Sequence, residues 1–425
     1  MSPANNKPIA YDLILRQGNV MLSPHQIESV DLAIKAGKIA AISAHIPESA
    51  AQEINLQGKL ISPPFVESHI HLDSALTAGE PRWNQTGTLF EGIKIWQERK
   101  QDLTLEDIKN RAIATLKRQA QQGILFVRTH ADVSESNLIA LEGLLEVREE
   151  VKDWMTVQVV AFPQDGIYGN SQNELLLEKA LEMGADAVGG IPHYEFTRED
   201  GVRSVQRIFE LAGKYDRLID IHCDEIDDDQ SRFLEGVAAA AIRTGMGAKV
   251  TASHTTALGS YNNAYAFKLI GLLERAQINF IANPLINITL QGRTDTYPKR
   301  RGITRVKELW QQGLNVSLGH DCIQDPWYSL GTGNMLDVAH MAVHVCQMTG
   351  VAEVGACYAM VTWNGAKTLN LGQNYGLEVG QPANLIVLGT ENPYTAIRDR
   401  APVEQVISQG TVLIETVPST TQCYW

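Results

Sequence analysis

Two histidines separated by one residue offer the first recognisable chemistry in this sequence. His69 and His71 end the apolar run 60–71. Because side chains alternate along a β-strand, their imidazoles would face the same side of that strand. Two imidazoles on one face can share a borderline metal ion such as Zn²⁺ or Fe²⁺. The same spacing also occurs by chance on protein surfaces, so a metal site requires further ligands elsewhere in the chain.

Further polar residues that could take part in chemistry follow other apolar runs. These polar residues are Gln164, His222, Glu225, His254 and Asp321. A single histidine of this kind is most simply a core residue bonded to the backbone, but several at strand ends point to a common site. His69, His71, His222 and Asp321 would supply three nitrogens and one carboxylate oxygen, which suits a catalytic metal that keeps an open position for water.

The segments that must position these residues alternate between strand-like and helical patterns. Eight apolar, strand-like runs occupy residues 60–71, 124–133, 155–164, 185–196, 217–224, 249–254, 278–284 and 314–321. Helical spacing fills intervening stretches such as 104–122, 137–153, 230–245 and 262–277. Eight such units predict an α/β fold of the (β/α)₈ barrel type, in which chemistry sits at the C-terminal ends of the strands. An open doubly wound sheet is disfavoured, because no Gly-X-Gly-X-X-Gly follows the first strand.

The two ends of the chain have a different pattern, that of short strands without intervening helices. Short alternating runs punctuated by Gly, Asn and Pro fill roughly residues 11–60, and similar runs return at 382–388 and 403–415. We predict one small β-sandwich domain built from both termini. Its parts would be residues 1–62 and 376–425, flanking a catalytic barrel at 63–375.

Composition narrows the class of protein. The 425 residues are 44% hydrophobic and 20% charged, as in ordinary globular proteins, and the net charge of −13 argues against a nucleic-acid surface. No stretch approaches the roughly 18 apolar residues of a membrane helix, and the start lacks a signal-peptide core, so we expect a cytoplasmic protein without a membrane partner. The five scattered cysteines form no Cys-X-X-Cys pair, which excludes a zinc ribbon and the signature of the small zinc-dependent base deaminases.

Long segments of the sequence resemble bacterial cytosine deaminase of the amidohydrolase superfamily. They are 63–73, 83–93, 127–130, 161–164, 191–198, 220–228, 251–256, 295–305 and 319–321. The resemblance implies an amidohydrolase-type barrel, one divalent metal ion per subunit (Fe²⁺ or Zn²⁺), a small nucleobase substrate and a homo-oligomer. The implied reaction is deamination of a 4-amino-2-oxopyrimidine, cytosine to uracil plus ammonia.

The resemblance also implies catalytic roles. Glu225 would pass protons to ring nitrogen N3 and to the leaving ammonia, and His254 would stabilise charge near the attacked carbon. Asp321 would hold the metal and take the first proton from water. Substrate contacts would come from Gln164, Cys322, Trp327, Leu89 and Phe162.

Other functions compete with this prediction. A binuclear hydrolase of cyclic amides would need a lysine at the end of the fourth strand, where residues 189–193 read GGIPH. An aminohydrolase acting on another amino-oxo heterocycle, such as isoguanine, creatinine or a triazine, remains open. A non-catalytic binding scaffold would require loss of the metal or proton-transfer residues, and all of them are present.

Two positions depart from the family pattern. Cys322 stands where a second acid is expected near C5 of the bound ring, and Leu76 stands where a glutamine is expected. We predict that Cys322 favours 5-substituted cytosine such as 5-methylcytosine, with drift at a supporting position as the equal alternative. His130 and His193 would only support the ligands, and His320, adjacent to Asp321, would face away from the metal.

Overall fold

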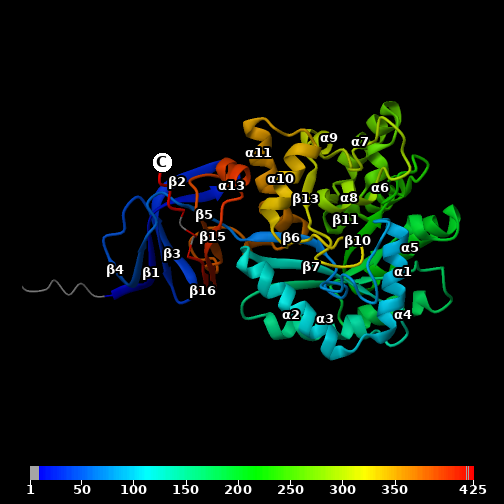
Figure 1. Cartoon of the computed structure of the whole chain (residues 1–425), viewed down its shortest axis with the longest axis horizontal. Coiled ribbons are helices and arrows are strands. Elements are labelled where there is room, and N and C mark those ends of the chain that lie inside the picture. The colour runs from blue at the N-terminus through cyan, green and yellow to red at the C-terminus, as the bar shows by residue number, and fades with distance from the viewer. Residues whose placement is uncertain (1–8, 418, 420) are drawn as a thin grey trace, which may run out of the picture.

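The computed structural model describes residues 9–417, 419 and 421–425 and contains two sheets (Figure 1). One sheet is a barrel of eight parallel strands whose order follows the chain. They are β6 (Phe65–Ile70), β7 (Ile124–Asp132), β8 (Thr156–Phe162), β9 (Ala187–Gly190), β10 (Leu218–Cys223), β11 (Val250–His254), β12 (Asn279–Ala282) and β13 (Asn315–Leu318). A parallel bridge between Ile70 and Asp321 joins the first strand to the last. The predicted (β/α)₈ barrel is confirmed.

All eight barrel strands lie within the predicted runs, but two runs divide. Residues Leu60–Ser62 form β5, which pairs with the other sheet, because Pro63 and Pro64 follow and lack backbone N–H groups. In the run 185–196, only Ala187–Gly190 is a strand, and the short 3₁₀ helix η2 (Pro192–Tyr194) follows, with proline at its first position.

Helices connect the barrel strands and cover the outside of the barrel (Figure 1). They are α1 (Leu89–Arg99), α2 (Leu105–Gln121), α3 (Ile139–Val151), α4 (Asn173–Glu182), α5 (Arg198–Tyr215), α6 (Phe233–Thr244), α7 (Asn263–Ala276), α8 (Pro284–Leu290), α9 (Val306–Gln311), α10 (Met335–Val345), α11 (Val351–Met360) and α12 (Trp363–Thr368). Side chains of Thr104, Thr197 and Asn262 accept hydrogen bonds at the starts of α2, α5 and α7, which fixes where these helices begin. Their apolar faces are buried against the barrel in one continuous core.

The second sheet combines both ends of the chain. Its strands are β1 (Ile9–Ser23), β2 (Gln26–Lys35), β3 (Lys38–Ser43), β4 (Ser49–Asn55), β5, β14 (Leu385–Leu388), β15 (Val403–Ser408) and β16 (Thr411–Glu415), with α13 (Pro393–Asp399) after β14. Strand β5 pairs with β14, which joins the N-terminal strands to the C-terminal ones. The sheet branches at β1, whose first half pairs with β4 and second half with β5, and encloses its own apolar core. The domain limits given above stay a prediction.

No helix in the described part of the chain has both the length and the apolar character needed to cross a membrane.

Candidate metal and substrate site

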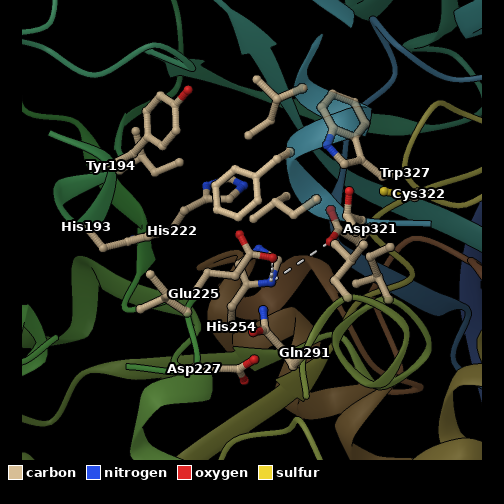
Figure 2. Close-up of a pocket in the computed structure, with 18 of the residues that line it drawn as sticks. His193, Tyr194, His222, Glu225, Asp227, His254, Gln291, Asp321, Cys322 and Trp327 are labelled. Carbon is tan, nitrogen blue, oxygen red and sulfur yellow. Dashed lines mark ion pairs between the residues drawn. The ribbon is translucent and has the colours of Figure 1, made fainter. Parts of the chain in front are cut away.

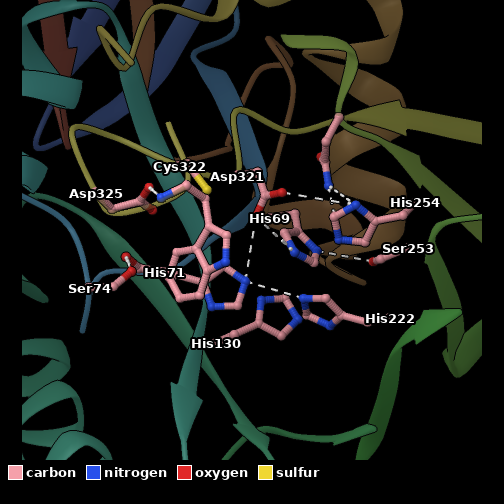
Figure 3. A network of polar contacts seen from close by, with 12 residues as sticks. His69, His71, Ser74, His130, His222, Ser253, His254, Asp321, Cys322 and Asp325 are labelled. Carbon is pink, nitrogen blue, oxygen red and sulfur yellow. Dashed lines mark hydrogen bonds and ion pairs between the residues drawn. The ribbon is translucent and has the colours of Figure 1, made fainter. Parts of the chain in front are cut away.

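Four side chains from three places in the barrel converge at its C-terminal end (Figure 3). His69 and His71 come from the end of β6, His222 from β10, and Asp321 follows β13. Asp321 Oδ1 lies 3.5 Å from Nε2 of both His69 and His71, and Nε2 of His71 lies 3.2 Å from Nε2 of His222. Atoms about 2.1 Å from one metal ion are about 3.0 Å apart at octahedral angles and about 3.4 Å apart at tetrahedral angles. The observed separations match the edges of such a coordination polyhedron.

The protonation of these groups also fits a divalent cation. Burial, together with the neighbouring histidines, lowers the pKa of His69, His71 and His222 well below the usual range, so the imidazoles are neutral, as ligands must be. Burial and the nearby Glu225 raise the pKa of Asp321. Nε2 of His69 is buried without a hydrogen-bond partner in the described residues. A divalent cation bound there would stabilise the ionised form of Asp321 and give Nε2 of His69 a partner, so these residues can hold a metal.

Backbone strain accompanies the polar groups. His254 at the end of β11 has φ 66° and Asp321 has φ 69°, both in the left-handed region that non-glycine residues rarely adopt. These conformations are held by backbone hydrogen bonds from Thr255 to Cys223 and from Asp321 to His69. Strain of this kind concentrates at functional sites, where neighbouring strands over-determine it.

Glu225 and His254 form a buried pair beside the four converging side chains (Figure 2). Glu225 Oε1 lies 3.2 Å from Nδ1 of His254, which lies 3.9 Å from Asp321 Oδ2. Burial raises the pKa of Glu225 above its usual range and lowers the pKa of His254 to about 3. Burial therefore favours the protonated form of Glu225, which can donate a proton.

A cavity of about 400 Å³ opens over these groups. Among the residues predicted to contact substrate, Gln164, Leu89, Cys322 and Trp327 line it. Figure 2 shows Trp327 and Cys322 on one side of the cavity and Tyr194 on the other. Cys322 belongs to an apolar cluster with Ile286 and Leu290, against which Leu89 and Trp327 pack.

One expectation about the cavity needs correction. Phe162 is fully buried outside the cavity lining, and its ring stacks on the His222 imidazole with centroids 4.0 Å apart. It supports a candidate ligand instead of contacting substrate. Leu76, which stands where a glutamine is expected, also lies outside the cavity lining and packs against the barrel core.

Sequence reasoning missed several polar groups around the site. Asn283 and Asn287 place amide nitrogens 3.3 and 3.0 Å from Nδ1 of His254, and Ser253 Oγ lies 3.1 Å from Nδ1 of His69. Asn283 follows β12 directly and could have been found by the strand-end rule. Asp220, two residues before His222 and so on the same face of β10, could have been found by strand alternation.

The remaining histidines differ in position. His130 is buried, with its ring centroid 4.1 Å from that of His69, and His193 lines the cavity. Nδ1 of His320 bonds the Cys322 carbonyl at 2.9 Å and its Nε2 accepts from the Gly333 amide, which places this ring outside the metal cluster.

Comparison with known proteins gives the wider relationship. The sequence is 32% identical over 412 residues to N-isopropylammelide isopropyl amidohydrolase of Pseudomonas sp. (strain ADP), covering 95% of this chain and 98% of that protein. The structure is similar to 5-methylcytosine deaminase from Klebsiella pneumoniae, solved with 5-fluorocytosine, at 48% identity and a TM-score of 0.93, covering 96% of this chain and 99% of that one. The same enzyme solved with phosphonocytosine gives the same identity and TM-score.

The model of the amidohydrolase family matches residues 52–414, which include the whole barrel and all of the converging side chains. The protein therefore belongs to the amidohydrolase family.

Proposed function

We propose that this protein is a metal-dependent hydrolase that deaminates cytosine and 5-substituted cytosines, converting the 4-amino group and water into a 4-oxo group and ammonia. The observation that carries the proposal is the 48% identity, at a TM-score of 0.93, to a 5-methylcytosine deaminase solved with cytosine analogues. The polar groups at the cavity floor supply the chemistry that this reaction requires.

The metal ligands in this proposal are His69, His71, His222 and Asp321. A divalent ion bound there would lower the pKa of water and so supply the nucleophile at neutral pH. Imidazole and carboxylate ligands accept both Zn²⁺ and Fe²⁺. Asp321 contributes a carboxylate oxygen that can take the first proton from water.

Glu225 acts as the proton carrier. Burial raises the pKa of its carboxyl group and so favours the protonated form, which can protonate ring nitrogen N3. The carboxylate that results can collect a proton for delivery to the leaving amine. His254 is held neutral by burial and faces both Glu225 and Asp321, where it can stabilise the oxyanion that develops at C4. Gln164 offers a donor and an acceptor for the N1 and O2 edge of the ring.

Cys322 makes the site favour an apolar substituent, such as a methyl group, at C5 of the pyrimidine ring. Burial and Asp321 raise the pKa of its thiol, which therefore stays neutral and sits among Ile286 and Leu290. A neutral thiol in apolar surroundings accepts a methyl group, whereas a carboxylate would lose solvation against it.

A second candidate is hydrolysis of an exocyclic amine on a triazine. It is favoured by the 32% identity, over 98% of its length, to N-isopropylammelide isopropyl amidohydrolase. The two candidates differ in the ring that the site accepts, not in the atoms that act.

The test is amine release by the purified, metal-loaded protein: ammonia from cytosine and 5-methylcytosine, and isopropylamine from N-isopropylammelide. We expect turnover of the two cytosines and at least a roughly 100-fold lower kcat for Glu225→Gln, because the amide cannot transfer protons. Glu142→Gln, on the exposed side of α3, is the matched control and should keep full activity. Full activity of Glu225→Gln would overturn the mechanism, and turnover of the triazine alone would overturn the substrate.

A further inference from the structure

A buried chain of polar side chains crosses the barrel beneath the candidate metal ligands. It runs from Arg128 on β7 through Asp220 on β10 and Ser253 on β11 to His69 on β6, and all four residues are fully buried. Asp220 Oδ2 accepts from Arg128 at 3.0 Å, its Oδ1 accepts from Ser253 at 2.6 Å, and Ser253 Oγ lies 3.1 Å from Nδ1 of His69. Figure 3 shows the last of these contacts beside the histidine cluster.

Arg128 anchors this chain. Its five N–H donors all have acceptors: Gln158 takes two of them, and Asp220, Thr251 and the Thr368 carbonyl take one each. A fully bonded guanidinium cannot rotate without breaking several buried hydrogen bonds. It therefore fixes the Asp220 carboxylate and supplies its counter-charge.

The single proton of the serine hydroxyl decides the state of His69. The Asp220 carboxylate only accepts, so the Ser253 hydrogen points to Asp220 and the oxygen offers a lone pair to His69. The contact with His69 is a hydrogen bond only if Nδ1 carries the imidazole hydrogen. Nε2 of that neutral tautomer has a free lone pair, and Nε2 is the atom that lies 3.5 Å from Asp321.

We propose that Ser253, held by Asp220 and Arg128, is a positioning residue that fixes His69 as the Nδ1–H tautomer and so presents Nε2 to a divalent metal. This inference rests on the metal dependence proposed above. Hydrogen bonding of the second ring nitrogen is a general means of orienting a histidine ligand and raising its basicity. Without the hydroxyl, Nδ1 has no acceptor among the described residues and the Nε2–H tautomer becomes accessible, so each binding event has to restore the correct form.

The test is Zn²⁺ affinity, measured by competition with a chromogenic chelator. We expect Ser253→Ala to bind Zn²⁺ about 10- to 100-fold more weakly than the wild type, the effect usual for removal of a group that orients a ligand. Ser317→Ala is the matched control: Ser317 is equally buried in the barrel, on β13, and bonds Thr368 and the Phe280 carbonyl. It should leave Zn²⁺ affinity unchanged.

A second measurement does not depend on a variant that folds. In the metal-free wild-type protein with ¹⁵N-labelled histidine, NMR should show His69 with a hydrogen on Nδ1. An Nε2–H tautomer, or wild-type Zn²⁺ affinity in Ser253→Ala, would overturn the role of Ser253 while leaving the proposed deaminase intact. A wild-type protein that releases ammonia without any metal would overturn the proposed function, and the NMR result would still decide the tautomer.

Discussion

Glu67 and Asp220 are both buried carboxyl groups inside the barrel, yet their surroundings give them different charges. Asp220 faces the Arg128 guanidinium. Glu67 pairs with no Lys or Arg in the described residues, and burial raises its pKa to about 8 although its Oε1 accepts from the backbone amides of His69 and His320. Gln119 lies beside Oε2 of Glu67 and has a buried carbonyl oxygen without a partner, to which a protonated Glu67 could donate after an amide flip.

Glu67→Gln should therefore change how stability depends on pH. The pKa of an unfolded glutamate is about 4.3, so the unfolded chain loses this proton first and wild-type stability falls as pH rises from about 4.3 to about 8. Relative to Glu67→Gln, the free energy of unfolding of the wild type should fall by up to about 1.4 kcal/mol per pH unit, and this fall should cease above about pH 8. Urea unfolding between pH 5 and pH 9 measures it, with Glu142→Gln as the exposed control. A stability difference between Glu67→Gln and wild type that does not vary with pH would contradict a neutral Glu67.

Cys322→Asp tests the specificity argument at a single residue. A carboxylate within the apolar cluster should disfavour a methyl group at C5 and raise the cytosine to 5-methylcytosine ratio of kcat/KM by about 10-fold or more. Each substrate is the control for the other, because a general defect lowers both values equally. An unchanged ratio would show that Cys322 does not discriminate between substrates with and without a methyl group at C5.

At the scale of elements, helix α1 sets the position of the cavity wall. Gly92 of α1 lies against the Trp327 indole, where a Cβ atom would overlap the ring, and the ring of Trp96 in the same helix lies 6.3 Å from that of Trp327 between centroids. The indole is further located by the Trp327 amide, which donates to Asp325. The glycine thus serves a close approach between a helix and the wall of the cavity.

Gly92→Ala should displace Trp327 and lower kcat/KM about 10- to 100-fold, since small misplacements of a positioning group are costly in rate. Its helix should not weaken, because alanine is the better helix former. Gly271→Ala, in helix α7 with open space around it, is the matched control and should raise stability by about 0.5–1 kcal/mol at unchanged activity. Wild-type kinetics for Gly92→Ala would remove the role assigned to this contact.

At the scale of the whole molecule, the candidate metal site lies on the seam of the barrel. Strands β6 and β13 meet through the Ile70–Asp321 bridge, and hydrogen bonds link the His71 amide to the Asp321 carbonyl and the Asp321 amide to the His69 carbonyl. The proposed ligands stand on both sides of this closure. A bound ion would therefore tie the first barrel strand to the last.

Metal removal should then destabilise the protein and loosen this seam first. Metal present at 100 times its dissociation constant adds about 2.7 kcal/mol, so chelation should lower Tm and speed amide exchange at residues 69–71 and 321 more than at β9, opposite the seam. His222→Ala, which removes a ligand away from the seam, should show a smaller response to chelator. Equal exchange rates with and without metal would contradict the stabilisation of this seam by the bound ion.

Local patterns in the sequence predict the barrel, its eight strands and the polar residues at their C-terminal ends. Strand alternation and the carboxyl-end rule depend only on local patterns, so they suffice to group His69, His71, His222 and Asp321. They could not show that Phe162 stacks beneath His222, or that Leu76 lies away from the cavity.

The contacts across the barrel could not be predicted in this way. Ser253 and His69 are 184 residues apart in sequence, and Arg128 and Asp220 are 92 apart. Whether such pairs touch depends on the stagger of the strands and on side-chain length inside the closed barrel, and neither leaves a periodic trace in the sequence. The sequence shows which residue types lie at each strand end, but the series of hydrogen bonds that orients them forms only when the barrel closes.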